Sequence, residues 1–324
     1  MSKQFVSQLR PGDKVEGYFA VVSKQLVPFS AKSSRAGEEY LKITLRDVSG
    51  TIEGRVWNDA LSLNSIFDVD DIVYIEGKVI KFNNLQITIH NIEYTPKDGM
   101  ELDNFIPTSS EKISVLWEQF EHMLAEIDNF YLKKLLYSLF SEDFKEKFKK
   151  APAGKSIHHA YRGGLLKHTL ETGEIAKKIC EIYDNKINKE ILLAGSLLHD
   201  IGKTKEYDLT SITFKLTDKG KLHGHIVLGR DILIEHAAKI DNFPPELIDE
   251  LGHMIISHHG CQEWGSPEIP KTIEALALHH ADLTGARVSQ ALDAISSLRT
   301  EETWTNWDRY LQRSFFNPFR DKYF

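Results

Sequence analysis

The first 95 residues alternate between apolar and polar positions with the period of two that is typical of β-strands. The clearest run is Tyr40–Asp47, in which Leu41, Ile43 and Leu45 alternate with polar side chains. A short helix is expected over Asp59–Phe67. The predicted strands are Lys14–Lys24, Tyr40–Asp47, Ile52–Trp57, Ile72–Phe82 and Leu85–Tyr94, with a turn at Asn83–Asn84 between the last two.

Five strands with a helix between the third and the fourth have the order of an OB-fold, a small barrel that often binds single-stranded nucleic acid or sugars. On the second and third strands, Lys42, Arg46 and Arg55 are expected to point outwards, where they can meet phosphates. Tyr40 or Trp57 could stack a base. Strands that face water carry charge in any case, and Trp57 could simply cap the barrel, so a binding role and a structural role both stay open.

The pattern becomes helical after the first third of the chain. Residues 96–110 have the composition of a linker, with Gly99 and several acidic side chains. We therefore expect an OB-fold domain over residues 1–95 and a helical domain over residues 111–324. A short hairpin between Tyr207 and Leu216 is the one predicted interruption of the helices.

The composition indicates a globular protein without a strong overall charge. With 324 residues, of which 41% are hydrophobic and 27% charged, the chain can form two cores, and wholesale disorder is excluded. The net charge of −7 means that contact with a polyanion must be local or metal-borne. The two cysteines, Cys180 and Cys261, fit a reducing compartment, and no apolar run approaches the roughly 18 residues of a spanning helix. A cytoplasmic protein with no membrane partner is expected.

Histidine is distributed unevenly, because 12 of the 14 histidines lie between His158 and His280. A cluster of imidazoles is typical of metal ligation or acid–base chemistry. Within it, a helix that is apolar nearly all round ends in the pair His199–Asp200, two groups that are costly to bury without partners. A cation near the helix end could be reached by both side chains, and the second carboxylate oxygen would remain free for another cation. For this pair alone, a satisfied core histidine beside a capping aspartate would be the favoured interpretation.

Further candidate ligands lie on both sides of this pair, in or between apolar helices. The ordered series is His168, His199, Asp200, His225, His258, His259 and Asp282. This order resembles the HD superfamily of metal-dependent phosphohydrolases, and the additional histidines resemble its two-metal branch.

The resemblance implies that Asp200 bridges two divalent ions. The implied sites are His168, His199 and Asp282 for one ion, and His225 with His258 or His259 for the other. Imidazole and carboxylate ligands suit Mn²⁺, Fe or Zn²⁺ better than an all-oxygen Mg²⁺ site, and we favour Mn²⁺. Lys203 is expected to stabilise a phosphate oxygen, and Arg162 either holds a substrate phosphate or only solvates the surface.

An OB-fold in front of an HD domain, together with the stretches Ser156–Leu166, Ser257–Gly260 and Trp264–Pro267, closely resembles the YhaM family of bacterial exoribonucleases. The resemblance implies a manganese-dependent 3′-5′ exonuclease that shortens single-stranded RNA, can act on single-stranded DNA and releases nucleoside 5′-monophosphates. The aromatic tail over residues 303–324 favours a contact between subunits, and hence a homo-oligomer, over stacking on RNA.

Two alternatives come from other functional classes. One is an HD-type phosphodiesterase that acts on a small nucleotide, such as the HD-GYP enzymes, but their Gly-Tyr-Pro triplet is missing after the histidine pair. The other is a non-catalytic nucleic-acid-binding protein whose HD domain only mediates oligomerisation. A decayed site should lack a ligand, and none is missing from the series.

Overall fold

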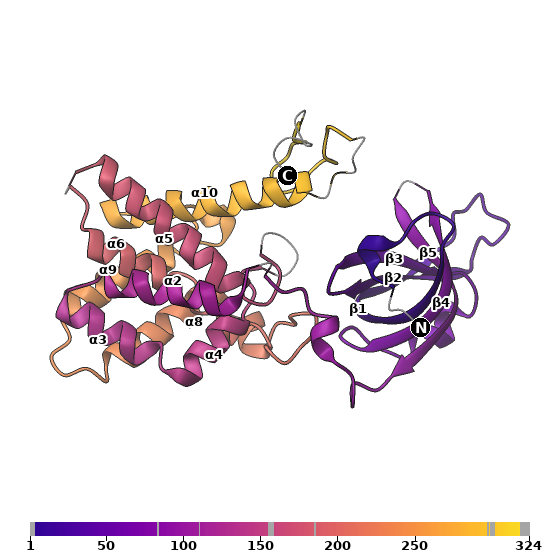
Figure 1. Cartoon of the computed structure of the whole chain (residues 1–324), viewed down its shortest axis with the longest axis horizontal. Helices are drawn as coiled ribbons and strands as arrows, with labels where there is room; N and C mark the ends of the chain where they lie inside the picture. Colours follow the sequence, from indigo (N-terminus) through magenta and orange to yellow (C-terminus); the bar gives the residue numbers. More distant parts are fainter. Residues whose placement is uncertain are drawn as a thin grey trace. The chain divides into compact units, whose positions relative to one another are not determined.

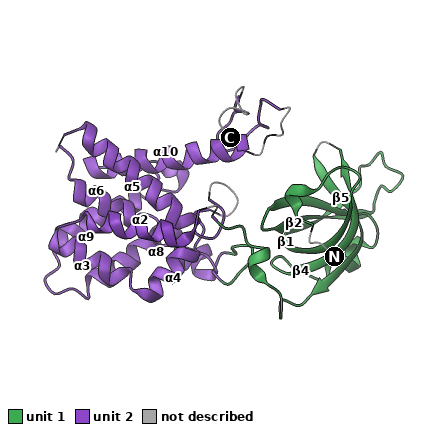
Figure 2. Ribbon diagram, viewed as in Figure 1, with its two compact units in different colours: residues 1–108, 210–215 green, residues 109–209, 216–324 purple. Residues whose placement is uncertain are grey.

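The computed structural model describes residues 4–82, 84–109, 111–154, 159–184, 186–296, 298 and 302–317 (Figure 1). The chain divides into two compact units (Figure 2). Unit 1 consists of Met1–Thr108 and Thr210–Lys215, and unit 2 consists of Ser109–Leu209 and Leu216–Phe324. Asn83 of the predicted turn, residues 156–158 of the family-like stretch and the tail from residue 318 lie outside the described residues.

Unit 1 is built on a closed five-stranded barrel with the strand order β1-β2-β3-β5-β4. Its elements are β1 (Lys14–Pro28), β2 (Glu39–Asp47), β3 (Gly50–Val56), α1 (Ala60–Asn64), β4 (Ile72–Lys81) and β5 (Leu85–Thr95), with short 3₁₀ turns η1 (Val6–Gln8) and η2 (Leu102–Asn104). The parallel pairing of β3 with β5 and the antiparallel pairing of β1 with β4 close the barrel. The predicted OB-fold is confirmed.

The register between β2 and β3 explains which side chains fill the barrel. Leu41, Ile43 and Leu45 of β2 are fully buried in its core, as the alternation predicts. Lys42 of β2 lies opposite Arg55 of β3, on the other side of the sheet. The outer face of these two strands therefore carries the charged positions.

Six residues from the middle of the helical region, Thr210–Lys215, belong to unit 1 (Figure 2). Asp70 anchors them, because its Oδ1 accepts hydrogen bonds from the hydroxyl of Ser211 at 2.6 Å and from the amide and hydroxyl of Thr213 at 2.9 Å each. Lys97 lies 2.8 Å from Oδ2 of the same carboxylate. Burial alone would raise the pKa of Asp70, but Lys97 and these hydrogen bonds outweigh it and hold the pKa below its usual value.

Arg46 of β2 is covered by the same segment. Its guanidinium donates a hydrogen bond to the carbonyl of Ile212 and lies 5.8 Å from the centre of the Phe214 ring. Only 5% of Arg46 is exposed, and burial lowers its pKa to about 10. The prediction that Arg46 meets phosphates on an open strand face is therefore wrong, because a distant part of the chain covers this position.

Unit 2 is helical, as predicted, and encloses a single large apolar core. Its helices are α2 (Ile113–Ala125), α3 (Phe130–Leu139), α4 (Glu142–Lys150), α5 (Gly164–Ile182), α6 (Lys189–Leu198), α7 (Lys203–Glu206), α8 (Asp218–Ala237), α9 (Pro245–Ser257) and α10 (Ile273–Ser296), with a 3₁₀ turn η3 (Gln262–Trp264). Tyr207 and Leu216, the ends of the predicted hairpin, pair as an isolated antiparallel bridge, but the residues between them form turns and no strands. In the described ranges, we find no helix with both the length and the apolar character needed to cross a membrane.

Candidate metal centre

Five helices of unit 2 bring all seven predicted ligands together. His168 comes from α5, the pair His199–Asp200 from the end of α6, His225 from α8, the pair His258–His259 from the end of α9, and Asp282 from α10. These residues are separated by up to about a hundred positions in the sequence, so the site depends on how the helices pack.

The end of α6 delivers His199 and Asp200 into the interior of unit 2. Asn188 caps the start of the helix, and its side chain accepts hydrogen bonds from the backbone amides of Glu190 and Ile191. Every residue from Ile191 to the end of the helix is buried. Beyond it the chain passes close to α8, where a Cβ atom on Gly202 would collide with the backbone carbonyl of His225. Only glycine permits this approach, which brings Asp200 and His225 together.

A break inside α8 positions His225. Gly224 has a φ of 68°, a left-handed conformation that interrupts the helix directly before the histidine. The amide and Nδ1 of His225 then lie 3.0 Å and 3.2 Å from Oε1 of Glu206. Glu206 thus supports the candidate ligand His225 from outside the ligand set. The sequence analysis did not identify it, because nothing in the local pattern distinguishes it from other acidic residues.

The first group of candidate ligands consists of His168, His199, Asp200 and Asp282. Nε2 of His168 lies 3.2 Å from Nε2 of His199, 3.5 Å from Oδ2 of Asp200 and 3.0 Å from Oδ1 of Asp282. Nε2 of His199 lies 3.4 Å from Oδ2 of Asp200. His168, His199 and Asp200 offer ligand atoms close enough together to hold one metal ion.

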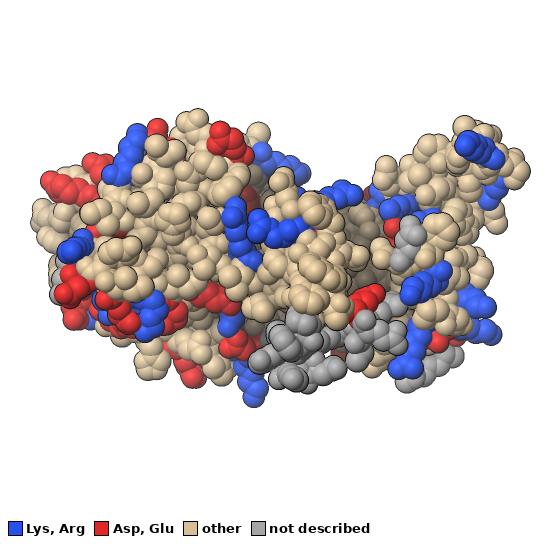
Figure 3. Space-filling model, turned by 90° about the horizontal axis from the view of Figure 1, so that it is seen from above, with Lys and Arg blue, Asp and Glu red and all other residues tan. Residues whose placement is uncertain are grey.

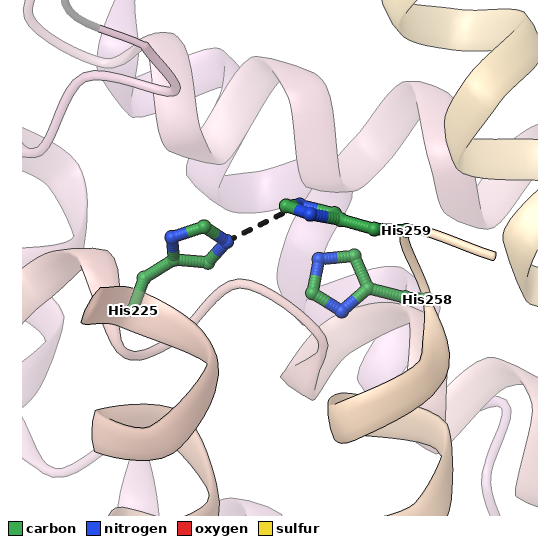
Figure 4. A group of neighbouring side chains, drawn as sticks. All are labelled: His225, His258 and His259. Atoms are coloured by element: carbon green, nitrogen blue, oxygen red, sulfur yellow. Dashed lines mark hydrogen bonds between the residues drawn. The ribbon is translucent and has the colours of Figure 1, made fainter. Parts of the chain in front are cut away.

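The second group consists of His225, His258 and His259, whose rings converge from two helices (Figure 4). Nε2 of His225 lies 3.4 Å from Nε2 of His259. The other carboxylate oxygen of Asp200, Oδ1, faces this group at 3.5 Å from Nε2 of His225 and 3.6 Å from Nε2 of His258. Asp200 thus presents one oxygen to each group of imidazoles.

The hydrogen bonds of the imidazoles prepare their Nε2 atoms for metal ligation. Nδ1 of His199, His258 and His259 each lies 2.7 Å from a backbone carbonyl oxygen. A carbonyl only accepts, so each Nδ1 carries the proton and the neutral ring keeps a lone pair on Nε2. Among the described residues, the buried atoms Oδ1 of Asp200 and Nε2 of His258 have no hydrogen-bond partner. A divalent cation fits this donor set, because it would satisfy these buried lone pairs.

The protonation states also fit a cation. Burial lowers the pKa of His168 and His259 and places that of His258 well below its usual value, which favours neutral rings. At His199 burial also acts to lower the pKa, but the carboxylates of Asp200 and Asp282 outweigh it and raise the pKa, an attraction that a cation between these groups would replace. Burial opposes ionisation of Asp200 and Asp282, but Lys203 and His199 outweigh it for Asp200, and His168 with the other nearby histidines outweighs it for Asp282. Both carboxyl pKa values therefore lie well below the usual range. Neutral imidazoles beside ionised carboxylates are the ligand forms that metals bind.

A cavity of about 220 Å³ opens onto these groups. Its lining includes Lys203, whose Nζ lies 2.6 Å from Oδ2 of Asp200. Trp264 and His279 also line it. The sequence analysis gave Trp264 no role of its own in the site, although it lies only five residues after His259. The carbonyl oxygen of Trp264 accepts the hydrogen bond from Nδ1 of His259. Nδ1 of His279 lies 2.7 Å from the carbonyl oxygen of His258. Arg162 does not line this cavity.

The outer face of the barrel carries the remaining predicted contacts. Lys42 and Arg55 both pair with Glu53, at 2.8 Å each. Trp57 packs against Tyr40, with ring centres 4.8 Å apart, and against Phe29, at 5.9 Å. On the face of the molecule drawn in Figure 3, Lys and Arg side chains are interspersed with Asp and Glu, so any basic area there is local.

Comparison with known proteins gives the same two domains in the same order. Residues 165–287 match the model of the HD domain, and residues 21–96 match that of an OB-fold nucleic acid binding domain. The first range contains all seven candidate ligands, and the second contains most of the barrel.

Similar curated proteins extend the likeness over nearly the whole chain. The 3′-5′ exoribonuclease YhaM of Shouchella clausii is 29% identical over 313 residues, which is 95% of either chain. The proteins of the same name from Oceanobacillus iheyensis and Listeria welshimeri are each 29% identical, over 87% and 90% of this chain and 88% and 93% of their own. The chain thus carries an HD domain and an OB-fold nucleic acid binding domain, and it is similar over most of its length to curated proteins named 3′-5′ exoribonuclease YhaM.

Proposed function

We propose that this chain is a metal-dependent 3′-5′ exoribonuclease that hydrolyses single-stranded RNA to nucleoside 5′-monophosphates. The proposal is supported by the name shared by its relatives, 3′-5′ exoribonuclease, and by the OB-fold and HD domain matches. The single observation that carries it is the position of Asp200, whose two oxygens face two separate groups of imidazoles. A carboxylate between two such groups is suited to a two-metal site.

The proposed ligands divide between two ions, with Mn²⁺ favoured and Fe or Zn²⁺ as alternatives. One ion would be held by His168, His199, Asp200 and Asp282, and the other by Asp200, His225, His258 and His259. Divalent ions bound there would activate a water molecule and neutralise charge on the scissile phosphate. His259 is included because its Nε2 faces His225, whereas the sequence left its role open.

Lys203 is the proposed contact for a non-bridging phosphate oxygen. Its side chain is buried and lines the same cavity as Asp200 and Asp282. An ammonium group fixed there by Asp200 needs no reorganisation when negative charge develops on the phosphate. Arg162 does not line the cavity, and nothing in the structure supports a phosphate contact for it.

The barrel would bind the single strand with little base preference. Lys42 and Arg55 supply charge, and Trp57 with Tyr40 supplies aromatic surface. Contacts to phosphates and stacking on bases do not require a 2′-hydroxyl, so we propose that single-stranded DNA is also accepted. We further propose a cytoplasmic homo-oligomer, because the two cysteines are free and the tail is rich in aromatic residues.

The test uses 5′-labelled oligoribonucleotides of one sequence with either a free or a blocked 3′ end, incubated with Mn²⁺. We expect products that shorten stepwise from the free 3′ end, mononucleotides with a 5′-phosphate, and no such activity in Asp200→Asn. Retention of the RNA at full length with tight binding would instead indicate a non-catalytic binding protein. Hydrolysis of cyclic dinucleotides without cleavage of RNA would indicate a small-nucleotide phosphodiesterase.

A further inference from the structure

A second cavity, of about 570 Å³, lies beside the metal centre in unit 2. It is formed by η3, the second half of α10 and the described part of the C-terminal segment. Its lining includes Trp264, Arg287, Val288, Tyr310, Arg313 and Phe315. We call it the C-terminal groove.

The groove adjoins the metal cavity at Trp264, which lines both. Helix α10 runs along both as well: Asp282 and Ala286 line the metal cavity, and Arg287 and Ala291 line the groove. From Asp282 to Ala291 a helix advances about 14 Å. That distance corresponds to about four stacked nucleotides.

The charges of the groove favour a polyanion. Its charged lining residues are Arg287 and Arg313, with no carboxylate in the lining. Within the described part of the chain, neither arginine forms an ion pair with an acidic side chain. The carboxylate of Asp308, which lies nearby in sequence, is already bound by the side chain of Gln290 and by the amides of Tyr310 and Leu311. Nε of Arg313 donates a hydrogen bond to the carbonyl of Leu311 at 2.9 Å, so its two terminal nitrogens and the guanidinium of Arg287 are the groups that can meet a phosphate.

The aromatic side chains favour a ligand with flat rings. Trp264 is 49% exposed and Tyr310 is 69% exposed. The guanidinium of Arg287 lies 5.2 Å from the centre of the Trp264 ring. Exposed aromatic rings interleaved with arginine are the means by which proteins bind single strands without reading their sequence.

We infer that the C-terminal groove binds the nucleotides on the 5′ side of the bond that is cleaved, while the 3′-terminal nucleotide occupies the metal cavity. This inference rests on the proposed exonuclease function. Arg287 and Arg313 contact successive phosphates, and Trp264 and Tyr310 stack on bases. The groove then contributes to the affinity for long strands independently of the barrel.

The experiment compares the full-length double variant Arg287→Gln/Arg313→Gln with the wild-type protein. The matched control is Arg309→Gln, because Arg309 is exposed on the same C-terminal segment but does not line the groove. For a single-stranded 12-mer we expect KM and the dissociation constant to rise about 10-fold in the double variant. The slope of log affinity against log salt should fall by about 1.4, the value for two lost phosphate contacts on a single strand. Hydrolysis of a dinucleotide, which has no phosphate on the 5′ side of the cleaved bond, should be impaired less than hydrolysis of the 12-mer. Every property of Arg309→Gln should stay unchanged.

Equal affinity of the double variant and Arg309→Gln for the 12-mer would overturn the inference. So would a change of solution mass in the double variant, measured by light scattering, without a change in RNA affinity, because the groove would then be a contact between subunits. If the wild-type protein cleaves neither substrate, the exonuclease proposal fails by itself. The binding titration with the 12-mer still decides whether the groove holds a single strand.

Discussion

Arg46 and Ile212 are 166 residues apart in the chain, yet the guanidinium of Arg46 donates a hydrogen bond to the carbonyl of Ile212. The barrel unit is therefore completed by six residues that lie between α7 and α8 in the sequence. The same two helices carry Lys203, Glu206 and His225 of the candidate metal centre. Deleting the barrel would leave Ile212 and Phe214, now fully or nearly fully buried, without their surroundings, so point variants are the cleaner probes.

Asp70→Ala should weaken the binding of the segment Thr210–Lys215 to the barrel. The variant removes the acceptor of the buried Ser211 hydroxyl and leaves the amide of Thr213 with only its longer contact of 3.1 Å to the Ser211 hydroxyl oxygen, a loss of about 2–3 kcal/mol. We expect the amide of Thr213 to exchange with solvent faster in hydrogen–deuterium exchange, and the barrel transition to move to lower denaturant concentration. Asp98→Ala removes an exposed carboxylate from the same unit and should change neither property. Unchanged protection of Thr213 in Asp70→Ala would contradict the anchoring role of Asp70.

Asp200→Asn should remove at least one of the two metal ions and strongly reduce exonuclease activity. The amide keeps the shape of the side chain but offers one oxygen in place of two, while Oδ1 and Oδ2 face different groups of imidazoles. We expect the metal content, measured by plasma mass spectrometry, to fall from two ions per chain to one or fewer. Hydrolysis of RNA should fall by at least about 100-fold.

The control is Asp241→Asn, which makes the same chemical change at an exposed position of unit 2. It should retain both ions and full activity. Two ions per chain in Asp200→Asn would show that Asp200 does not bridge.

Local patterns predicted the elements of both units, because alternation and helical spacing reflect the faces that each segment buries. The alternation placed Leu41, Ile43 and Leu45 in the barrel core, where they are fully buried. The alternation also placed Arg46 on the outer face, but it could not predict that another segment of the chain buries this side chain. The covering residues Ile212 and Phe214 come from a segment whose own pattern predicts only a short hairpin. Contacts of such sequence separation leave no local signal.

The candidate metal centre was predictable for a different reason. Histidine and aspartate at the ends of apolar helices are costly to bury, so their ordered occurrence already indicates a shared partner. The residues that support them were not predictable. Two examples are Glu206, which contacts His225, and Trp264, whose carbonyl accepts a hydrogen bond from His259. Glutamate and tryptophan occur at many positions without such a role, so their residue type gives no signal. Their roles depend on the approach of α7 to α8 and on the turn after α9.

Chelation should destabilise unit 2 selectively. Without a cation, the ionised side chains of Asp200 and Asp282 remain buried, with Oδ1 of Asp200 unpaired among the described residues. A ligand at 100 times its dissociation constant contributes about 2.7 kcal/mol to the free energy of unfolding. We expect dialysis against a chelator to lower the calorimetric transition of unit 2 and leave the barrel transition in place. Restored Mn²⁺ should reverse the shift, and an unchanged transition would contradict a resident metal.

Lys203→Met should separate a contact with the phosphate from a merely structural ion pair. The ammonium lies 2.6 Å from Oδ2 of Asp200 in a buried position, so it could act on the substrate or only hold the carboxylate. If Lys203 binds a phosphate oxygen as charge develops, kcat falls by about 100-fold while both ions are retained, and Lys203→Arg restores part of the rate. Lys205→Met is the control, because Lys205 lies on the same short helix but is exposed and pairs with Glu235. Loss of metal in parallel with activity would show instead that Lys203 acts by positioning Asp200.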